Sequence, residues 1–282
     1  MTRFAPFLFV LIWSGAFVAV RAGLPDITPF YFLAIRFTVA AAVLALAAAF
    51  VVRNWRPGLS GLAHLAFSGA IINAVYLGGA YLAMTEIRGA TMALIGALHP
   101  IATALVAGPL LGERFRGRQW IGFLLGAGGV ALVAGIGAFD LGRPAGIAWA
   151  VGSIAALAGG TLYHARFCRD APLIGANTVQ LASAAVTAWA FTWAFETPHA
   201  VWTPGMVAAL AYLTFGVSLG AMALLLYMLR QGEAGRAASN FYLVPGVTAL
   251  LAWAFLGEDL PAAMWPGFAL TMAGVWLIRR RA

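Results

Sequence analysis

The chain has 282 residues, of which 63% are hydrophobic and only 9% are charged, whereas about a quarter of the residues of an ordinary soluble domain are charged. All 17 basic residues are arginines, nine residues are acidic, and the net charge is +8. This composition excludes a soluble fold. The arginines lie in the breaks between long apolar stretches rather than on one face, which argues against nucleic-acid binding.

Ten membrane-spanning helices are predicted, because apolar stretches of about 20 residues are long enough to cross a hydrocarbon core of roughly 30 Å. Transmembrane β-strands are about half as long and alternate in polarity, so the fold class is all-α integral membrane. The first stretch follows Arg3 as in a signal peptide, but it lacks a small-x-small cleavage site and is interpreted as a span. The predicted spans are 4–22, 30–52, 62–84, 89–110, 118–138, 145–167, 173–195, 205–229, 235–256 and 262–278.

The arginines are distributed unequally between the two sides of these spans, which is the pattern that sets orientation in a membrane. Arg21, Arg88 and Arg143 fall on one side, and Arg36 lies inside the second span. The side that carries both termini is therefore predicted to be cytoplasmic. Its thirteen arginines are Arg3, Arg53, Arg56, Arg114, Arg116, Arg118, Arg166, Arg169, Arg230, Arg236, Arg279, Arg280 and Arg281.

An internal repeat appears when the sequence is shifted by 145 residues. The shift aligns Pro100 with Pro245, and 15 of the 33 residues in 100–132 are identical to their counterparts in 245–277. Apolar composition alone would give far fewer identities.

The repeat predicts two domains of five helices each, residues 1–140 and 141–282. Because five is odd, the second domain enters the membrane in the opposite direction to the first. Inverted repeats of this kind are typical of transporters that bind their substrate near the membrane midplane.

Particular stretches of the sequence resemble the EamA family of the drug/metabolite transporter superfamily. They are HPIATALVAGPLLGERFRGRQWIGFLLGAGG, which lies within Ala90 to Gly129, its counterpart YLVPGVTALLAWAFLGED, the early IWSGAFVAVR, and Ile35-Arg36-Phe37. The resemblance implies a ten-helix secondary carrier of a bacterial-type inner membrane, with cytoplasmic termini. It favours the YddG-type amino-acid exporters but does not specify the substrate.

We expect a secondary transporter that exports neutral or aromatic amino acids, such as threonine, methionine or phenylalanine, or related small metabolites, by alternating access. No acidic residue falls in the middle of a predicted span, whereas a proton-driven carrier of cationic drugs usually needs a carboxylate there. Multidrug, nucleoside or purine efflux is the alternative. A channel or a membrane-embedded enzyme is less favoured, because the chain is a duplicated monomer without paired catalytic groups.

The expected partners are a small-molecule substrate and membrane lipid, and the protein is expected to act as a monomer or a dimer. Without lysine the chain has no GxxxxGK[ST] phosphate-binding motif. With Cys168 as the single cysteine it has no intramolecular disulfide and no Cys-based metal site. We expect no cofactor, no metal and no catalytic residue.

Substrate-binding residues are predicted from polar and aromatic side chains at mid-membrane depth, where unpaired polar groups are costly. His99 is the strongest candidate, as a substrate contact or a proton acceptor, and a histidine that is merely bonded to a neighbouring helix is the alternative. The predicted set is Trp13, Ser14, Asn73, Tyr76, Tyr81, His99, Tyr163, Ser218, Asn240 and Tyr242.

Three further predictions concern backbone and packing. Pro100 and Pro245 each remove a helix hydrogen bond near the middle of a span, and they are expected to act as gating hinges or static bends. Arg36 is expected to be structural and to pair with Asp26, with a direct hold on a substrate carboxylate as the alternative. Small residues that permit close helix packing are Gly122, Gly126, Gly128, Gly129, Gly267 and Gly274.

Overall fold

The computed structural model describes residues 4–52, 55, 57–87, 89–135, 143–231, 234–257, 262 and 264–279. In these ranges the named elements are all helical, and one isolated bridge joins Ile27 to Ala200. The residues used for the sequence predictions that lie outside the described ranges are Arg3, Arg53, Arg56, Arg88, Arg280, Arg281, Asp140, Glu233, Glu258 and Asp259.

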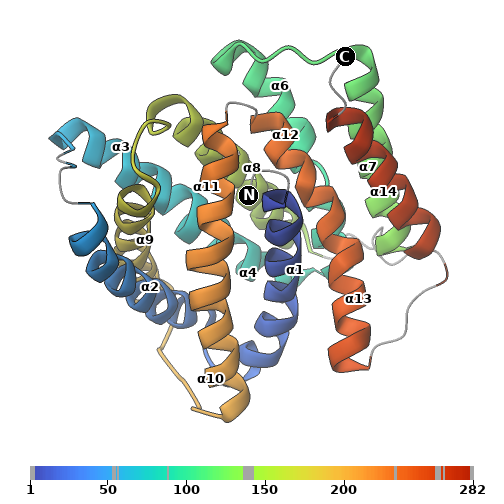
Figure 1. Cartoon of the computed structure of the whole chain (residues 1–282). Coiled ribbons are helices and arrows are strands. Elements are labelled where there is room, and N and C mark those ends of the chain that lie inside the picture. Colours follow the sequence, from blue (N-terminus) through green and yellow to red (C-terminus); the bar gives the residue numbers. More distant parts are fainter. Residues whose placement is uncertain are drawn as a thin grey trace. The chain divides into compact units, whose positions relative to one another are not determined.

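The helices form two compact units, each drawn from both halves of the sequence (Figure 1). The first unit comprises Met1–Gly78 and Tyr163–Gly232. The second comprises Gly79–Leu162 and Glu233–Ala282. Helices α4 (Tyr76–Glu86) and α8 (Pro144–Phe167) contribute residues to both units.

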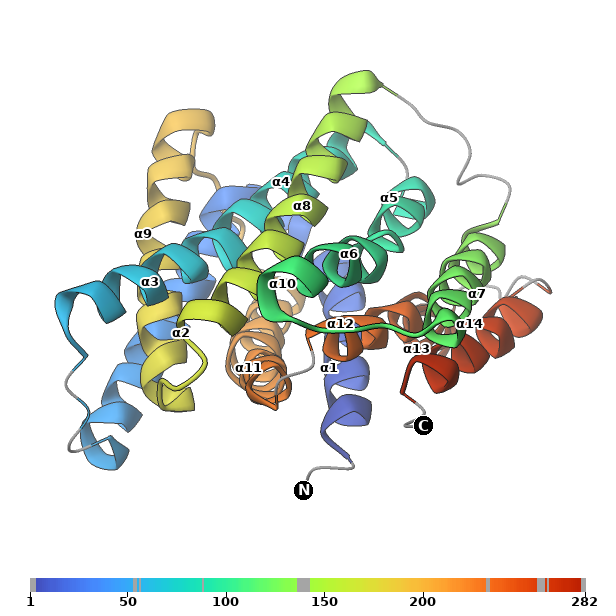
Figure 2. The same cartoon turned by 90° about the horizontal axis from the view of Figure 1, so that it is seen from above.

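In the first unit the principal helix pair is α2 with α9, which lie side by side (Figures 1 and 2). Helix α2 starts at Pro29, and the Glu196 carboxylate at the end of α9 accepts hydrogen bonds from the first free amides of α2, those of Phe30 and Tyr31. The elements of this unit are α1 (Ala5–Gly23), η1 (Leu24–Asp26), α2 (Pro29–Val51), α3 (Leu59–Gly69), η2 (Ala70–Val75), α9 (Leu173–Phe195), α10 (Pro204–Ala211), η4 (Tyr212–Ala221) and α11 (Met222–Arg230).

Two of these elements, η2 and η4, are π-helical segments inside longer helices. The 145-residue shift of the internal repeat places η2 on residues 215–220, which lie inside η4, and it aligns Asn73 with Ser218. A π-helical segment widens the turn and is frequently found at functional sites. The two halves of the sequence therefore share a local backbone distortion at matching positions.

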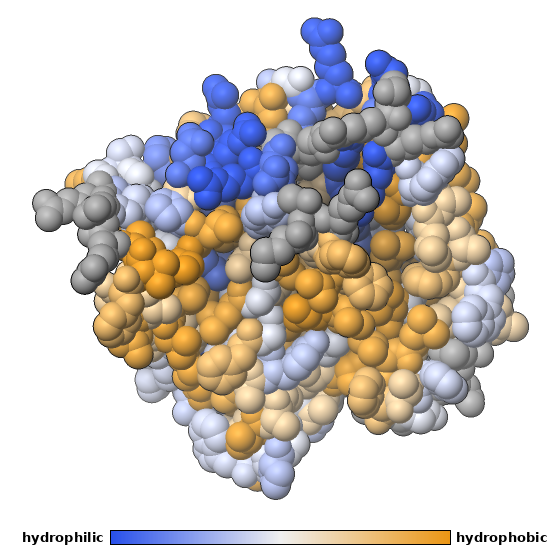
Figure 3. All heavy atoms as spheres, in the orientation of Figure 1, coloured by the Kyte–Doolittle hydropathy of each residue, from blue (hydrophilic) through white to orange (hydrophobic). Residues whose placement is uncertain are grey.

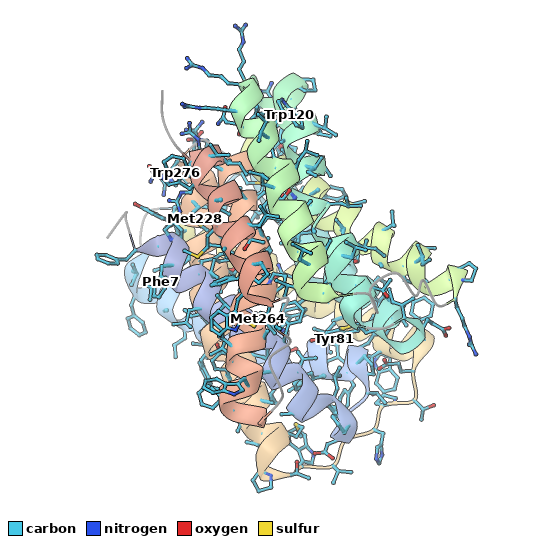
Figure 4. The ribbon with its side chains drawn as sticks, turned by 90° about the vertical axis from the view of Figure 1, so that its right-hand side faces the viewer. Phe7, Tyr81, Trp120, Met228, Met264 and Trp276 are labelled. Atoms are coloured by element: carbon cyan, nitrogen blue, oxygen red, sulfur yellow. The ribbon has the colours of Figure 1, made fainter. Side chains whose placement is uncertain are left out.

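In the second unit the principal helix pair is α7 with α14. Trp120, near the start of α7, and Trp276, near the end of α14, lie at the same end of this pair, so the helices run antiparallel (Figure 4). The elements of this unit are α5 (Gly89–Gly96), α6 (His99–Leu111), α7 (Gly117–Ala134), α12 (Ala234–Ser239), η5 (Asn240–Leu243), α13 (Val244–Leu256) and α14 (Met264–Arg279).

Glycine brings α7 and α14 into direct backbone contact. A Cβ atom on Gly122 would lie 2.7 Å from the carbonyl oxygen of Gly274, and one on Gly129 would lie 2.6 Å from that of Gly267. The internal repeat relates these two contacts to each other. The 145-residue shift aligns Gly122 with Gly267 and Gly129 with Gly274, so the contact of Gly122 with Gly274 corresponds to the contact of Gly267 with Gly129. The predicted close packing is confirmed at these four positions. It is wrong for Gly128, which is exposed and has only ordinary contact with Leu270 at 3.8 Å.

Both helices that carry a predicted hinge proline are interrupted just before it. Helix α5 ends at Gly96, and α6 begins at His99 with Pro100 in its first turn, where a missing amide hydrogen is tolerated. In the other helix the 3₁₀ segment η5 separates α12 from α13, whose second residue is Pro245. Both prolines therefore lie where one helical segment ends and the next begins, and their role as gating hinges or static bends stays a prediction.

Eight helical stretches in the described ranges are long and apolar enough to cross a membrane. Figure 3 shows hydrophobic surface over α2 and over α13, where Phe50 and Phe255 are 74% and 76% exposed. Two predicted spans are outside this set. Helix α9 carries internal polar residues such as Asn177 and Gln180, and α14 has only 16 described residues, fewer than the ~20 of a typical span. The eight stretches are Ala5–Asp26, Pro29–Val51, Leu59–Met84, Thr91–Leu111, Gly117–Ala134, Pro144–Phe167, Pro204–Arg230 and Ala234–Phe255.

Candidate functional site

The first unit contains a buried polar group centred on Ser218 of the π-helical segment η4. The Nε atom of Arg36 on α2 donates to the Ser218 hydroxyl at 2.8 Å, and the side-chain amide of Asn177 on α9 donates to the Ser218 carbonyl oxygen at 3.3 Å. All three side chains are at most 3% exposed. This arrangement ties α2 and α9 to the widened turn of η4.

The predicted pairing of Arg36 with Asp26 is wrong. The Asp26 carboxylate accepts a hydrogen bond from the hydroxyl of Thr203, at the start of α10. Arg36 is 3% exposed and points to Ser218 instead. A guanidinium that reaches a hydroxyl inside the unit does not have to extend toward the membrane surface, which was the basis of the prediction.

Two oxygen atoms beside this group have no hydrogen-bond partner among the described residues. They are the Oδ1 atom of Asn177 and the hydroxyl of Thr214, which precedes Ser218 by one helical turn. Buried polar atoms are nearly always satisfied in native proteins, so each exception calls for a partner such as water or a ligand. The group therefore presents unused acceptors beside a fixed cation.

The other predicted residues of the first unit are also buried or half-buried. Trp13 packs against Phe9 with ring centroids 5.2 Å apart, and Ser14 is fully buried. The amide of Asn73 donates to Gly69 within its own helix at 3.2 Å. Tyr76 is 7% exposed.

A second polar group of the first unit joins α3, the end of α8 and α9. The Tyr163 hydroxyl lies 2.6 Å from Nδ1 of His64. The side-chain nitrogen of Gln180 lies 2.7 Å from the Ser68 hydroxyl and 2.9 Å from Nδ1 of His164. Of these five residues only Tyr163 belonged to the predicted set.

In the second unit the two interrupted helices meet at His99. The His99 ring packs edge-on against Phe241 of η5, with centroids 4.9 Å apart, and its Nε2 atom lies 3.4 Å from the hydroxyl of Thr103. His99 is 1% exposed, and its Nδ1 atom has no hydrogen-bond partner within the described residues. The imidazole therefore retains one nitrogen for a ligand or a proton.

Asn240 and Tyr242 of η5 lie on either side of Phe241. The side-chain amide of Asn240 donates to the carbonyl oxygen of Ala237 at 2.9 Å, which joins the start of η5 to the preceding helix α12. The Tyr242 ring packs on Gly126 of α7, and its hydroxyl, like His99 Nδ1, is unsatisfied in the described part of the chain. Tyr81 is 4% exposed in the same unit.

The structure thus places six of the predicted residues in the first unit, where Ser218 and Tyr163 belong to different polar groups, and four in the second unit, and it adds residues that were missed. A usable signal for two of them was their spacing, because Asn177 and Gln180 are three positions apart and share one face of their helix. Two cavities, of about 310 and 200 Å³, are lined by none of the predicted substrate residues. No group of three or more His, Cys, Asp or Glu residues suited to a metal ion occurs in the ranges described.

Comparison with known proteins identifies the family. The EamA-like transporter family matches residues 4–135 and 144–280. A protein described as a probable terminal-alkyne amino-acid exporter of Streptantibioticus cattleyicolor is 30% identical, over 97% of this chain and 92% of its own length. The uncharacterized inner membrane transporter YedA of Escherichia coli strain K12 is 27% identical, over 97% of this chain and 89% of its own.

A solved crystal structure has the same fold, with a TM-score of 0.81 at 22% identity, over 98% of this chain and 95% of its own. The family matches cover nearly the whole chain and include all four stretches on which the sequence resemblance depended. The predicted family is confirmed: the protein is a multi-pass membrane protein and belongs to the EamA-like transporter family.

Proposed function

We propose that the protein is a secondary transporter that exports neutral or aromatic amino acids, or related small metabolites, by alternating access. The observation that carries the proposal is the chemistry of the interrupted and π-helical segments. Their buried side chains are hydroxyls, amides, aromatic rings and an imidazole, and the buried guanidinium of Arg36 lies beside the π-helical segment η4. Such groups suit a neutral or zwitterionic cargo.

The placement of the acidic residues supports the same cargo. The described acidic residues lie at helix ends or in loops, where Glu196 and Glu113 cap helix starts and Glu86 pairs with Arg143 at 3.1 Å. A carrier of cationic drugs needs a carboxylate within the membrane. The relative from Streptantibioticus, whose name includes amino-acid export, points in the same direction.

The proposed topology has ten spans, with α9 and α14 as the seventh and tenth. We place the inverted halves at residues 1–140 and 141–282 and both termini in the cytoplasm of a bacterial-type inner membrane. The reciprocal glycine contacts of α7 and α14 support the inverted repeat, because antiparallel helices with exchanged contacts are what a two-fold axis in the membrane plane produces. The substrate is a small molecule, and the carrier works as a monomer or a dimer.

Transport is tested with proteoliposomes loaded with a mixture of labelled amino acids, with and without a pH gradient. Selective efflux of neutral or aromatic amino acids, absent from protein-free liposomes, is the expected result. Faster efflux with the pH gradient than without it would show that transport is coupled to protons. Efflux of nucleosides or drugs but of no amino acid would reject the proposed cargo.

His99 and His199 form a matched pair for the same assay, since His99 is buried at the helix break and His199 is exposed in a loop. His99→Ala is expected to lower efflux about tenfold, because the imidazole presents an unused nitrogen, while the yield of folded protein is unchanged. His199→Ala is expected to transport like the wild type. Unchanged efflux in His99→Ala would remove this residue from the site.

A further inference from the structure

A cavity of about 310 Å³ lies in the first unit, between the segment before α3 and the loop that joins α8 to α9. Leu65 and Cys168 form its buried floor. The Trp55 indole forms one wall and rests on Gly175, where any larger residue would collide with the ring. The cavity therefore has a defined shape, and none of the proposed cargo residues lines it.

The rim of this cavity carries two arginines and one carboxylate with unused hydrogen-bonding capacity. Arg166 and Asp170 line the cavity, are exposed, and make no hydrogen bond or ion pair with the described residues. Arg169 uses its Nε atom to bond the carbonyl oxygen of Arg230 at 3.2 Å, which leaves its two terminal amino groups for another acceptor. These three side chains give the rim a net charge of +1 and more hydrogen-bond donors than acceptors.

Two helix starts next to the cavity add to its positive potential. Helix α3 begins two residues after Pro57, and α9 begins two residues after Ala171, and both of these residues line the cavity. Neither helix start has a side-chain cap. Uncapped amide groups at a helix start attract anions, so they reinforce the two arginines.

The surroundings of the cavity are those of a membrane interface. Phe167 lines it and is 50% exposed, and Phe67, further along α3, is 51% exposed. In a membrane these rings and the neighbouring Leu62 would face acyl chains, and tryptophan is enriched at the level of the headgroups. An anion held here would have apolar protein surface beside it.

We propose that this cavity binds the phosphate group of an anionic membrane phospholipid. Arg166 and Arg169 hold the phosphate oxygens, and Asp170 accepts a hydrogen bond from a headgroup hydroxyl. Basic pockets at the ends of transmembrane helices hold lipid headgroups in this way, and arginine suits phosphate because its donors form a planar fork. The proposal is independent of the exported cargo.

The test is thermal unfolding of the purified full-length protein in an uncharged detergent. The protein is titrated separately with diheptanoyl phosphatidylglycerol, diheptanoyl phosphatidylcholine and inorganic phosphate. Phosphatidylglycerol is expected to raise the unfolding midpoint of the wild type at the lowest concentration. In Arg166→Gln/Arg169→Gln the half-maximal concentration is expected to rise at least about tenfold, with an intermediate rise in Arg166→Lys.

The control is Arg116→Gln, which removes an exposed arginine at the start of α7 in the other unit and should respond like the wild type. If the double variant fails to fold, Arg166→Gln alone decides, because this side chain has no partner to lose among the described residues. A response to inorganic phosphate equal to that to the lipid would overturn the lipid assignment. Equal responses of wild type and double variant to phosphatidylglycerol would overturn the site itself.

Discussion

Helices α7 and α14 meet through glycine, whereas α2 and α9 meet through large side chains and a carboxylate. Both pairs join helices that the 145-residue shift relates to each other. At the α2–α9 contact Phe30 packs edge-on against Phe191 at 5.4 Å, and the Trp189 indole donates to the Thr38 hydroxyl at 3.0 Å. At the α7–α14 contact backbone atoms touch backbone atoms.

This difference between the two helix pairs shows which kind of contact keeps the aligned residues of the two repeats the same. At these two crossings both contacting residues are glycine, and Gly122 and Gly129 keep glycine counterparts at 267 and 274. Where side chains interlock, one large residue can fill the space alone, and the counterpart of Trp189 is the smaller Leu44. The first kind of contact retains sequence symmetry, and the second loses it.

The largest expected effect comes from adding one methyl group to the glycine contact. Gly129→Ala should lower the free energy of unfolding by about 2 kcal/mol or more, because the new Cβ would meet the backbone of α14. Gly128→Ala, on the exposed side of α7, should change it by less than about 0.5 kcal/mol. Both are measured by thermal unfolding in detergent. Equal decreases in the free energy of unfolding for the two variants would mean that backbone contact at Gly129 does not restrict how closely α7 and α14 pack.

A smaller effect is expected from the carboxylate that joins α9 to α2. Glu196→Ala leaves the first amides of α2 without their acceptor and should lower the free energy of unfolding by about 1 kcal/mol. Glu86→Ala removes only an exposed ion pair with Arg143, for which about 0.5 kcal/mol or less is expected. The same unfolding assay separates the two. If Glu196→Ala lowers the free energy of unfolding by no more than Glu86→Ala does, the Glu196 carboxylate does not stabilise the start of α2.

The smallest expected effect comes from one indole hydrogen bond. Trp189→Phe keeps a ring beside Tyr31 but loses the bond to Thr38, which should cost about 0.5–1 kcal/mol. Trp193→Phe is the control, because Trp193 is 72% exposed and its replacement should be neutral. If Trp189→Phe lowers the free energy of unfolding as much as Gly129→Ala does, the two helix pairs do not differ in how strongly they depend on a single contact.

Hydropathy and glycine spacing predicted the helices and the close packing at most of the glycines of α7 and α14, because length, apolarity and small size act locally along the chain, but they did not predict that these two helices are partners. The breaks before Pro100 and Pro245 were predictable for the same reason, since proline lacks an amide hydrogen wherever it stands. Gly128 shows the limit. It is adjacent to Gly129 but faces outward, and composition does not reveal the rotation of a helix about its axis.

The partners of buried polar residues were not predictable in this way. Arg36 reaches Ser218, 182 positions away, and only the packing of α2 against η4 decides this. The π-helical segments have no residue signature, because they arise from a shift in backbone hydrogen bonding. The roles of the predicted substrate residues, His99 included, remain predictions for the transport assay.

The composition of the two units has a consequence for how the protein is made. Each unit needs residues from both ends of the chain, so the ribosome has finished neither when the first half emerges. The glycine face of α7 must wait for α14, because Gly129 is synthesised 138 residues before Gly267, the glycine that it contacts. At about 5–20 residues per second, this interval is roughly 7–30 s, during which the insertion machinery or the lipid has to cover a surface that the finished protein buries.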